Sequence, residues 1–378
     1  MDIVAEISRN GFWFLVLLTP LVFIHELGHF LVARLCGVRV EVFSIGFGRE
    51  LFGFTDRHGT RWKFSLLPLG GYVRMFGQAP NELEGGVKPA PMSPEDKAVS
   101  FMHKSVGRRA AIVAAGPAAN FIFAIIVAAG VFGIVGKEFT SPVIDEVRAG
   151  SAAAEAGLLP GDKILALNGR GITAFEEVAD FILVNLDQPM ELTVERNGAQ
   201  MTVAARPKIV VRQDLLGKEV RTALLGIGSN HRGPVVKLGP IDAVGEAVNY
   251  TYTKTGDMLR GLWQMVSGVR PASEIGGVLR IATVSGAVAE VSFYQLTFLA
   301  ILLSINLGLI NLFPVPMLDG GHLAYYAVEA ARGPARSEGA QERGLKKRQA
   351  LVHSIKLFDT RKDIVYLKVV DYFRSLFT

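Results

Sequence analysis

Three long apolar runs dominate the pattern of hydrophobic and polar positions along this chain. They cover residues 11–34, 111–135 and 293–318. A helix of about 20 residues crosses the hydrocarbon core of a bilayer, so each run is long enough to span a membrane. The first run is too long for a cleavable signal peptide, and the charges before it are mixed. We therefore expect it to stay in the mature protein as a membrane-spanning helix.

Between the first two runs lies a segment with a different pattern. Residues 38–77 alternate β-branched and aromatic residues with polar ones and are interrupted by glycines, which is typical of short strands and hairpins. Residues 78–100 are rich in Pro and Glu and are expected to form a loop. The sequence thus predicts a β region followed by a loop.

Residues 139–207 have the pattern of a separate module. We expect a strand, a short helix ending at Gly157, a second strand, an amphipathic helix and a hairpin that turns at Asn197-Gly198. Residues 243–268 follow with a helical period and one apolar face. Two placements fit this last helix equally: the outer membrane surface or a linker packed on the module.

The composition narrows the class of protein. Half of the 378 residues are hydrophobic and 20% are charged, which is more apolar than usual for a soluble protein. The net charge of +5 is modest and forms no basic stripe, which argues against nucleic-acid binding. The single cysteine, Cys36, excludes an internal disulfide and is expected to be a small packing residue.

Charge also predicts the orientation in the membrane. Residues 34–110 are rich in Arg and Lys and contain few acids. Because positively charged loops stay in the cytoplasm, we expect this segment inside. The N-terminus and residues 137–291 then lie outside, and the tail after the third span, which is also basic, lies inside.

The first span carries the sequence HELGH at its centre, with His25, Glu26 and His29. Two histidines four residues apart lie on one face of a helix and can bind one zinc ion, and the glutamate can take a proton from water. A charged carboxylate at mid-bilayer costs about 2.5 kcal/mol or more, so packing alone does not explain this cluster. A metal keeps the imidazoles neutral and gives Glu26 a partner.

A catalytic zinc takes a third protein ligand and keeps one position open. The second span has no His, Asp or Glu, and its Asn120 is a poor zinc ligand. The third span ends in NLFPVPMLDGGH, residues 311–322, where Asp319 is the carboxylate and His322 the competing ligand. The prolines and glycines of this stretch break and bend the helix, which can turn Asp319 toward the first span.

Together these motifs resemble the site-2 proteases, which are intramembrane zinc metalloproteases of the M50 type. The resemblance rests on HELGH, on GPAAN (residues 116–120) in the second span and on NLFPVPMLDGGH. The stretches GVRVEVFSIGFGREL and LLPLGGYVRMFG are similar to the bacterial branch that includes the regulator-of-sigma-E protease, and GSAAAEAGLLPGDKILALNG resembles the core of a bacterial PDZ domain. The implied fold is an α-helical polytopic membrane protein with a membrane-associated β region and an inserted PDZ-like α/β domain.

The resemblance also implies roles for individual residues. One zinc ion per chain would be held by His25, His29 and Asp319, with Glu26 as the catalytic base. Asn311 would contact the substrate or the developing oxyanion. The strand that grips the substrate would include Gly70, Gly71, Tyr72 and Val73.

The implied function is hydrolysis of a peptide bond within or near the transmembrane segment of a single-pass membrane protein. An anti-sigma factor or a remnant signal peptide is the expected substrate class. The expected partners are this substrate, membrane lipid, and a substrate or regulator docked on the PDZ-like domain. The expected location is the bacterial inner membrane, with the PDZ-like domain on the periplasmic side. The rival interpretations are a non-enzymatic scaffold that recruits partners through that domain, and a transporter, against which the absence of repeated broken helices argues.

The expected organisation has seven parts. They are a first transmembrane helix with HExxH (1–36), a cytoplasmic-side β region and loop (37–110), a second transmembrane helix (111–136), a PDZ-like domain (137–210), an extracytoplasmic linker with an amphipathic helix (211–291), a third transmembrane helix with LDGG (292–322) and a basic amphipathic tail (323–378). The bacterial branch usually has a fourth span after LDGGH, whereas residues 364–377 are amphipathic and are expected to lie on the inner membrane surface.

Overall fold

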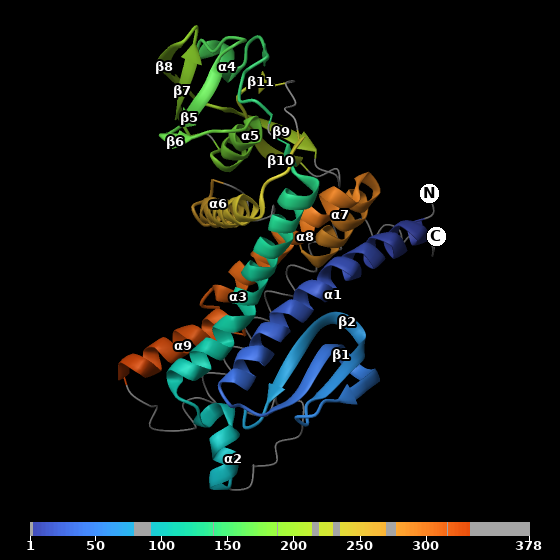
Figure 1. The fold of residues 1–378 in the computed structure, drawn as a ribbon. Coiled ribbons are helices and arrows are strands. Elements are labelled where there is room, and N and C mark those ends of the chain that lie inside the picture. The colour runs from blue at the N-terminus through green and yellow to red at the C-terminus, as the bar shows by residue number, and fades with distance from the viewer. Residues whose placement is uncertain are drawn as a thin grey trace. The chain divides into compact units, whose positions relative to one another are not determined.

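The computed structural model describes residues 3–78, 92–138, 140–186, 188–213, 219–229, 235–269, 277–315 and 317–332. The chain divides into two compact units, labelled by element in Figure 1. We call Met1–Val127 with Gly276–Thr378 the membrane unit, and Ala128–Ile275 the inserted unit. Most of the predicted loop and the predicted tail after residue 332 lie outside the described residues.

Three helices in the described ranges are long and apolar enough to cross a membrane, as the sequence predicts. They are α1 (Ile3–Leu35), α3 (Val106–Gly130) and α8 (Phe293–Leu312). Their most apolar stretches have mean hydropathies of 1.8, 2.4 and 1.9. The π-helical segment η3 (Val131–Val135) continues α3.

The helix α8 ends at Leu312, before the boundary at residue 322 expected from the sequence. Phe313 is extended, with φ −65° and ψ 142°, because a residue that precedes proline is disfavoured in the helical region. The chain turns through Met317, whose φ is +76°, and a new helix, α9 (Asp319–Arg332), begins at Asp319. The break therefore places Asp319 at the first position of a helix, where the helix dipole favours a carboxylate.

A further helix, α7 (Val278–Val291), packs on α1 within the membrane unit. The contact is close at Gly286, where a Cβ atom would collide with the side chain of Asn10. Arg9 and Glu290 form an ion pair beside it. The sequence assigned these residues to the linker before the third span, whereas the structure groups them with α1.

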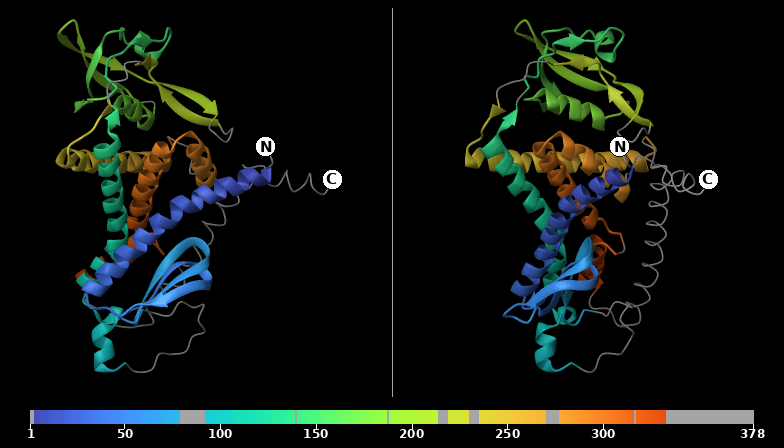
Figure 2. Two further views of the ribbon diagram at one scale, coloured as in Figure 1. Left: turned by 45° about the vertical axis from the view of Figure 1, so that its right-hand side comes forward. Right: turned by 90° about the vertical axis from the view of Figure 1, so that its right-hand side faces the viewer.

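The β region is built from two long strands, β1 (Val40–Thr55) and β2 (Arg61–Met75), which pair antiparallel. The first part of β1 lies in the middle, because Phe43 pairs with Trp62 on one side and with Val73 on the other. Phe43 is buried and stacks on Trp62 at 4.3 Å between ring centroids. Figures 1 and 2 show this sheet alongside α1. The end of β2 thus forms the sheet edge next to the helix that carries HELGH.

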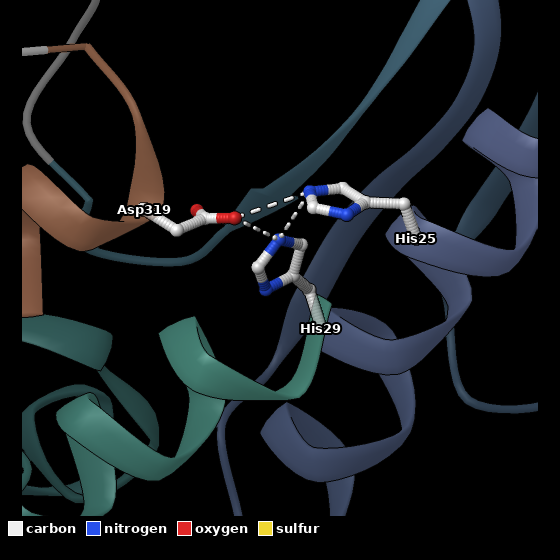
Figure 3. Close-up of side chains that lie close together, drawn as sticks. All are labelled: His25, His29 and Asp319. Atoms are coloured by element: carbon white, nitrogen blue, oxygen red, sulfur yellow. Dashed lines mark hydrogen bonds and ion pairs between the residues drawn. The ribbon is translucent and has the colours of Figure 1, made fainter. Parts of the chain in front are cut away.

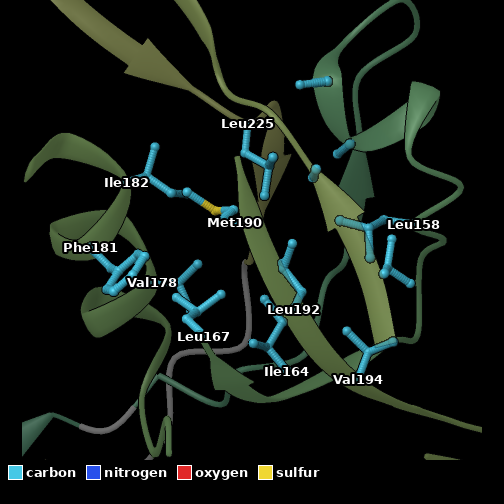
Figure 4. Packing of buried hydrophobic residues seen from close by; sticks show 14 of the residues in the cluster. Leu158, Ile164, Leu167, Val178, Phe181, Ile182, Met190, Leu192, Val194 and Leu225 are labelled. Carbon is cyan, nitrogen blue, oxygen red and sulfur yellow. The ribbon is translucent and has the colours of Figure 1, made fainter. Parts of the chain in front are cut away.

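The inserted unit contains a four-stranded sheet in the order β6-β5-β7-β8. Its hydrophobic core lies between this sheet and the helix α5 (Phe175–Val184) (Figure 4). The predicted hairpin turn is confirmed, since Asn197 and Gly198 both have positive φ, at +52° and +79°.

The strands and short helices of this unit are β3 (Lys137–Glu138), β4 (Glu146–Val147), α4 (Ala152–Glu155), β5 (Lys163–Leu167), β6 (Arg170–Gly171), β7 (Met190–Arg196), β8 (Ala199–Ala205), β9 (Lys208–Gln213), β10 (Glu219–Leu224), β11 (Ile227–Gly228) and β12 (Val235–Val236). In the membrane unit, α2 (Pro94–Val99) and η2 (Phe101–His103) precede α3.

The amphipathic helix α6 (Pro240–Val266) packs on the rest of the inserted unit through small residues. Ala243 and Ala247 are buried there, and Lys254 forms an ion pair with Asp180 of α5. This packing agrees with the linker placement, and contact of the helix with the outer membrane surface stays a prediction. The opposite face keeps Tyr252 and Trp263 exposed.

An ion pair between a buried aspartate and a partly exposed arginine ties the turn before β5 to the end of β7. Asp162 is fully buried and accepts hydrogen bonds from Arg196 Nε at 2.7 Å and Nη2 at 2.8 Å. The backbone N–H of Leu159 donates a third, at 2.9 Å. The hydrogen bonds from Arg196 hold the pKa of the Asp162 carboxyl below its usual range.

We therefore expect pH-dependent stability from this pair. The folded-state pKa of Asp162 is depressed, so its contribution is fully present above the unfolded pKa of about 3.9 and is lost as the pH falls through the folded pKa. Arg196→Met should lower the stability of this unit at pH 7, because the buried carboxylate loses its charged partner, and should lower it progressively less below pH 4. Amide hydrogen exchange of β5 and β7, compared with wild type at each pH, measures this. An equal loss of protection at pH 7 and pH 3 would contradict the assignment.

Candidate metal centre

The structure brings His25, His29 and Asp319 together at one point, as Figure 3 shows. His25 and His29 lie one turn apart on α1, and their Nε2 atoms are 3.3 Å from each other. Asp319 Oδ2, from the start of α9, lies 3.1 Å from His25 Nε2 and 3.5 Å from His29 Nε2. Residues separated by almost the whole chain thus point three donor atoms at a common centre.

This donor set fits a zinc ion. Tetrahedral zinc with bonds of about 2.0–2.1 Å keeps its ligand atoms about 3.3–3.4 Å apart, which is close to the three separations observed. Two imidazole nitrogens and one carboxylate oxygen are also a ligand set that catalytic zinc sites use. Asp319 Oδ2 is buried and makes no hydrogen bond within the described residues, so a cation would satisfy it.

The helix α3 packs against the site, although none of the three donor atoms comes from it. The backbone carbonyl of Ile112 accepts a hydrogen bond from His29 Nδ1 at 2.8 Å, which directs the lone pair of His29 Nε2 toward the centre. Gly116 lies directly against this ring, because a Cβ atom there would collide with His29 Nε2. Gly28 of α1 is equally constrained, since its Cβ atom would collide with the carbonyl oxygen of Ala115. The glycine of GPAAN is therefore needed for the approach of the two helices.

Glu26 lies on the side of α1 that faces the sheet edge. Its carboxylate accepts a hydrogen bond from the backbone N–H of Val73. A Cβ atom on Gly71 would lie 3.1 Å from Glu26 Cγ and 2.8 Å from the carbonyl oxygen of Ser44. The predicted base and part of the predicted substrate strand are therefore in contact.

The other residues of the predicted strand pack on β1. A Cβ atom on Gly70 would collide with the Phe47 ring, and that ring stacks on Tyr72 at 6.2 Å. Gly70 and Tyr72 thus shape the strand but do not join the three converging side chains.

Two further residues that the sequence singled out are not among the three converging donors. Asn311 is half-buried in the last turn of α8 and makes no described hydrogen bond to the three donor residues. His322, the competing third ligand, lies in α9 with its ring 6.5 Å from that of Tyr326 and is not part of the group. The geometry selects Asp319 as the residue that meets the two histidines.

Sequence reasoning missed a buried anchor for α9. Arg109 Nη2 donates a hydrogen bond to Glu329 Oε1 at 2.6 Å, and both side chains are less than 10% exposed. The Arg109 guanidinium also lies over the ring of Tyr326, at 4.9 Å. This ties the helix that begins with Asp319 to the start of α3. The basic charge of Arg109 was visible in the sequence, but its partner lies 220 positions away.

Three helices are long enough to span a membrane, one of them carries a histidine pair, and a carboxylate from the start of α9 meets that pair. This combination defines a membrane metalloprotease. The chain belongs to peptidase family M50, whose model matches residues 13–354. This membership favours the enzyme over the non-enzymatic scaffold.

Several relatives share most of the chain. A protein of Rhizobium meliloti, provisionally named a zinc metalloprotease, is 40% identical over 94% of this chain and 96% of its own length. A protein of Brucella suis with the same provisional name is 42% identical over 87% of this chain and 88% of its own. Metalloprotease MmpA of Caulobacter vibrioides is 35% identical over 97% of this chain and 99% of its own. These names agree with zinc as the expected cofactor.

Among solved structures, the PDZ domain of the SdrC-like protein of Listeria innocua is similar to part of this chain. It is 18% identical and has a TM-score of 0.20. The match covers 25% of this chain and 97% of that domain.

The close fit at Gly116 gives a test of the site. Gly116→Ala improves helix propensity but pushes His29 away from the centre, so zinc affinity should fall about tenfold or more. Gly107→Ala, on the same helix with nothing within 4 Å of the new Cβ atom, is the control and should bind as wild type. Chelator competition on the purified proteins measures both. Equal affinities for the two variants would show that the packing at Gly116 does not hold the site.

Proposed function

We propose that this chain is a zinc endopeptidase that cuts a peptide bond within or near the transmembrane segment of a single-pass membrane protein. The observation that carries the proposal is the convergence of His25 Nε2, His29 Nε2 and Asp319 Oδ2. Two of these residues lie within a helix apolar enough to cross a bilayer, past its middle. A site at that depth is placed to meet peptide bonds that water-soluble proteases do not reach.

His25, His29 and Asp319 would hold the zinc ion, which supplies a Lewis acid that polarises a peptide carbonyl and makes water nucleophilic near neutral pH. The Glu26 carboxylate takes the proton of the attacking water and passes it to the leaving amine. The side-chain amide of Asn311 donates a hydrogen bond to the developing oxyanion.

The sheet edge next to Glu26 supports a way to present the substrate. Within the part of the chain that the structure describes, residues 71–73 pair with β1 on one side only, through Ile45 and Phe43. A transmembrane helix must unwind before its peptide bonds become accessible, and adding it as a strand to this edge replaces the lost backbone hydrogen bonds. The added strand then takes the N–H of Val73 that Glu26 occupies, which frees the carboxylate beside the scissile bond.

Charge supports the proposed location and orientation. The basic segment 34–110 favours the cytoplasmic side of a bacterial inner membrane. Since His25 and His29 lie past the middle of α1, cleavage falls toward that side. The inserted unit then lies outside, where a PDZ-like domain docks or filters substrates and regulators. An anti-sigma factor or a remnant signal peptide, each with one transmembrane segment, is the substrate class that we propose.

Replacing the base separates catalysis from metal binding. Glu26→Gln should lower cleavage of a model transmembrane substrate by about 10²–10⁴-fold while zinc stays bound at one ion per chain. Glu41→Gln, which removes an exposed carboxylate paired with Arg74, is the matched control and should cleave as wild type. Comparative membrane proteomics of cells that express either variant then identifies natural substrates. Undiminished cleavage by Glu26→Gln would exclude the mechanism.

The role of Asn311 makes a separate prediction. Asn311→Leu removes the donor at nearly constant volume and should lower kcat about 10²–10³-fold with little change in KM or zinc content. Asn306→Leu, on the same helix and also half-buried, is the control. Steady-state kinetics in detergent measures the two parameters. A raised KM at unchanged kcat would assign Asn311 to substrate binding instead of oxyanion stabilisation.

A further inference from the structure

Asn120 of α3 is a fully buried polar side chain that the mechanism above does not use. Its Nδ2 atom lies 3.1 Å from Nδ1 of His25. Its Oδ1 atom is buried and has no hydrogen-bond partner among the described residues. Burying an amide in an apolar span is costly unless its hydrogen bonds are made, so this contact calls for an explanation.

If His25 binds a metal, the protonation of its imidazole determines whether the oxygen or the nitrogen of the Asn120 side chain faces Nδ1. A neutral imidazole that binds a metal through Nε2 carries its proton on Nδ1, and that N–H needs an acceptor. The oxygen of an Asn side chain accepts, whereas its nitrogen only donates. The two amide orientations occupy the same space and are distinguished by their hydrogen bonds. Turning the amide breaks no bond at Oδ1, which has none, and places that oxygen opposite Nδ1.

The backbone around Asn120 is fixed by α8. Ser304 Oγ donates a hydrogen bond to the backbone carbonyl of Asn120 at 2.8 Å, and both residues are fully buried. At Gly308 a Cβ atom would lie 3.0 Å from the carbonyl oxygen of Pro117 and from the ring of Phe121. The turn of α3 that carries Asn120 therefore has little freedom to move away from His25.

We propose that Asn120 is a positioning residue for the metal site, whose side-chain oxygen accepts a hydrogen bond from His25 Nδ1–H and holds Nε2 toward Asp319. Together with the carbonyl of Ile112, which does the same for His29, it makes α3 the element that orients both histidines. The inference rests on the metal site of the proposed function.

Zinc affinity of the purified full-length chain tests the proposal, by chelator competition. Asn120→Leu removes the acceptor at similar volume and should weaken zinc binding about 10–100-fold. Asn120→Asp keeps an acceptor and should bind within a few-fold of wild type. Ser285→Ala removes a buried hydroxyl of α7 that donates to the backbone of Ile281 in its own helix; it is the control and should bind as wild type.

A spectroscopic readout accompanies the affinity. With Co²⁺ in place of zinc, Asn120→Leu should change the visible absorption bands that report ligand geometry, while Asn120→Asp and Ser285→Ala should keep them. Wild-type affinity and bands in Asn120→Leu would overturn the proposal. So would equal weakening in Asn120→Leu and Asn120→Asp, or in Asn120→Leu and Ser285→Ala, because packing would then be the cause. If Asn120→Leu does not fold, Asn120→Ala replaces it with the same expectations.

A further variant distinguishes a failure of the Asn120 proposal from a failure of the metal site on which it rests. His25→Ala should abolish tight zinc binding. If it binds zinc as wild type does, the metal site itself is wrong. If His25→Ala loses zinc and Asn120→Leu does not, only the positioning role fails.

Discussion

The structure depends on the meeting of three polar side chains inside an apolar environment. Two imidazoles and a carboxylate are expensive in the middle of a membrane helix unless each finds a partner. Here His25, His29 and Asp319 find one another, at 3.1–3.5 Å between donor atoms. Separating these side chains would leave them without partners, so their contact holds α1 and α9 together.

Small residues and backbone groups make this meeting possible. Gly28 and Gly116 allow α1 and α3 to pack closely, because a Cβ atom at either position would collide with the facing helix. The proline after Phe313 ends α8, and the new helix then starts at the residue that is needed. The ion pair of Arg109 with Glu329 holds that helix from the other direction. Ligand geometry is thus set by packing around the site as much as by the ligands.

The structural features that depend on neighbouring residues in the chain could be predicted from the sequence. The spacing of His25 and His29 places them on one face of a helix, and Asp319 is the carboxylate next to a broken span. The resemblance extended this to the family, which the comparisons confirm. Helical period and apolar length are local properties, so the three spans could be predicted as well.

Contacts between residues far apart in the sequence could not be predicted, because a local pattern does not indicate which distant residue it will meet. Asn120 was visible as a lone polar residue, but its contact with His25 requires the packing of α1 on α3. The double pairing of Phe43, which makes residues 71–73 an edge beside Glu26, depends on how two long strands bend. The end of α8 at Leu312 and the packing of α7 on α1 likewise emerge only in three dimensions.

In the proposed enzyme, two histidines and one aspartate of this chain hold a single zinc ion. X-ray absorption spectroscopy of the zinc-loaded protein measures the ligands directly. The structure predicts nitrogen and oxygen neighbours at about 2.0–2.1 Å, with the outer-shell scattering of two imidazole rings. A spectrum with fewer than two imidazoles, or with a sulfur neighbour at about 2.3 Å as from Cys36, would contradict it.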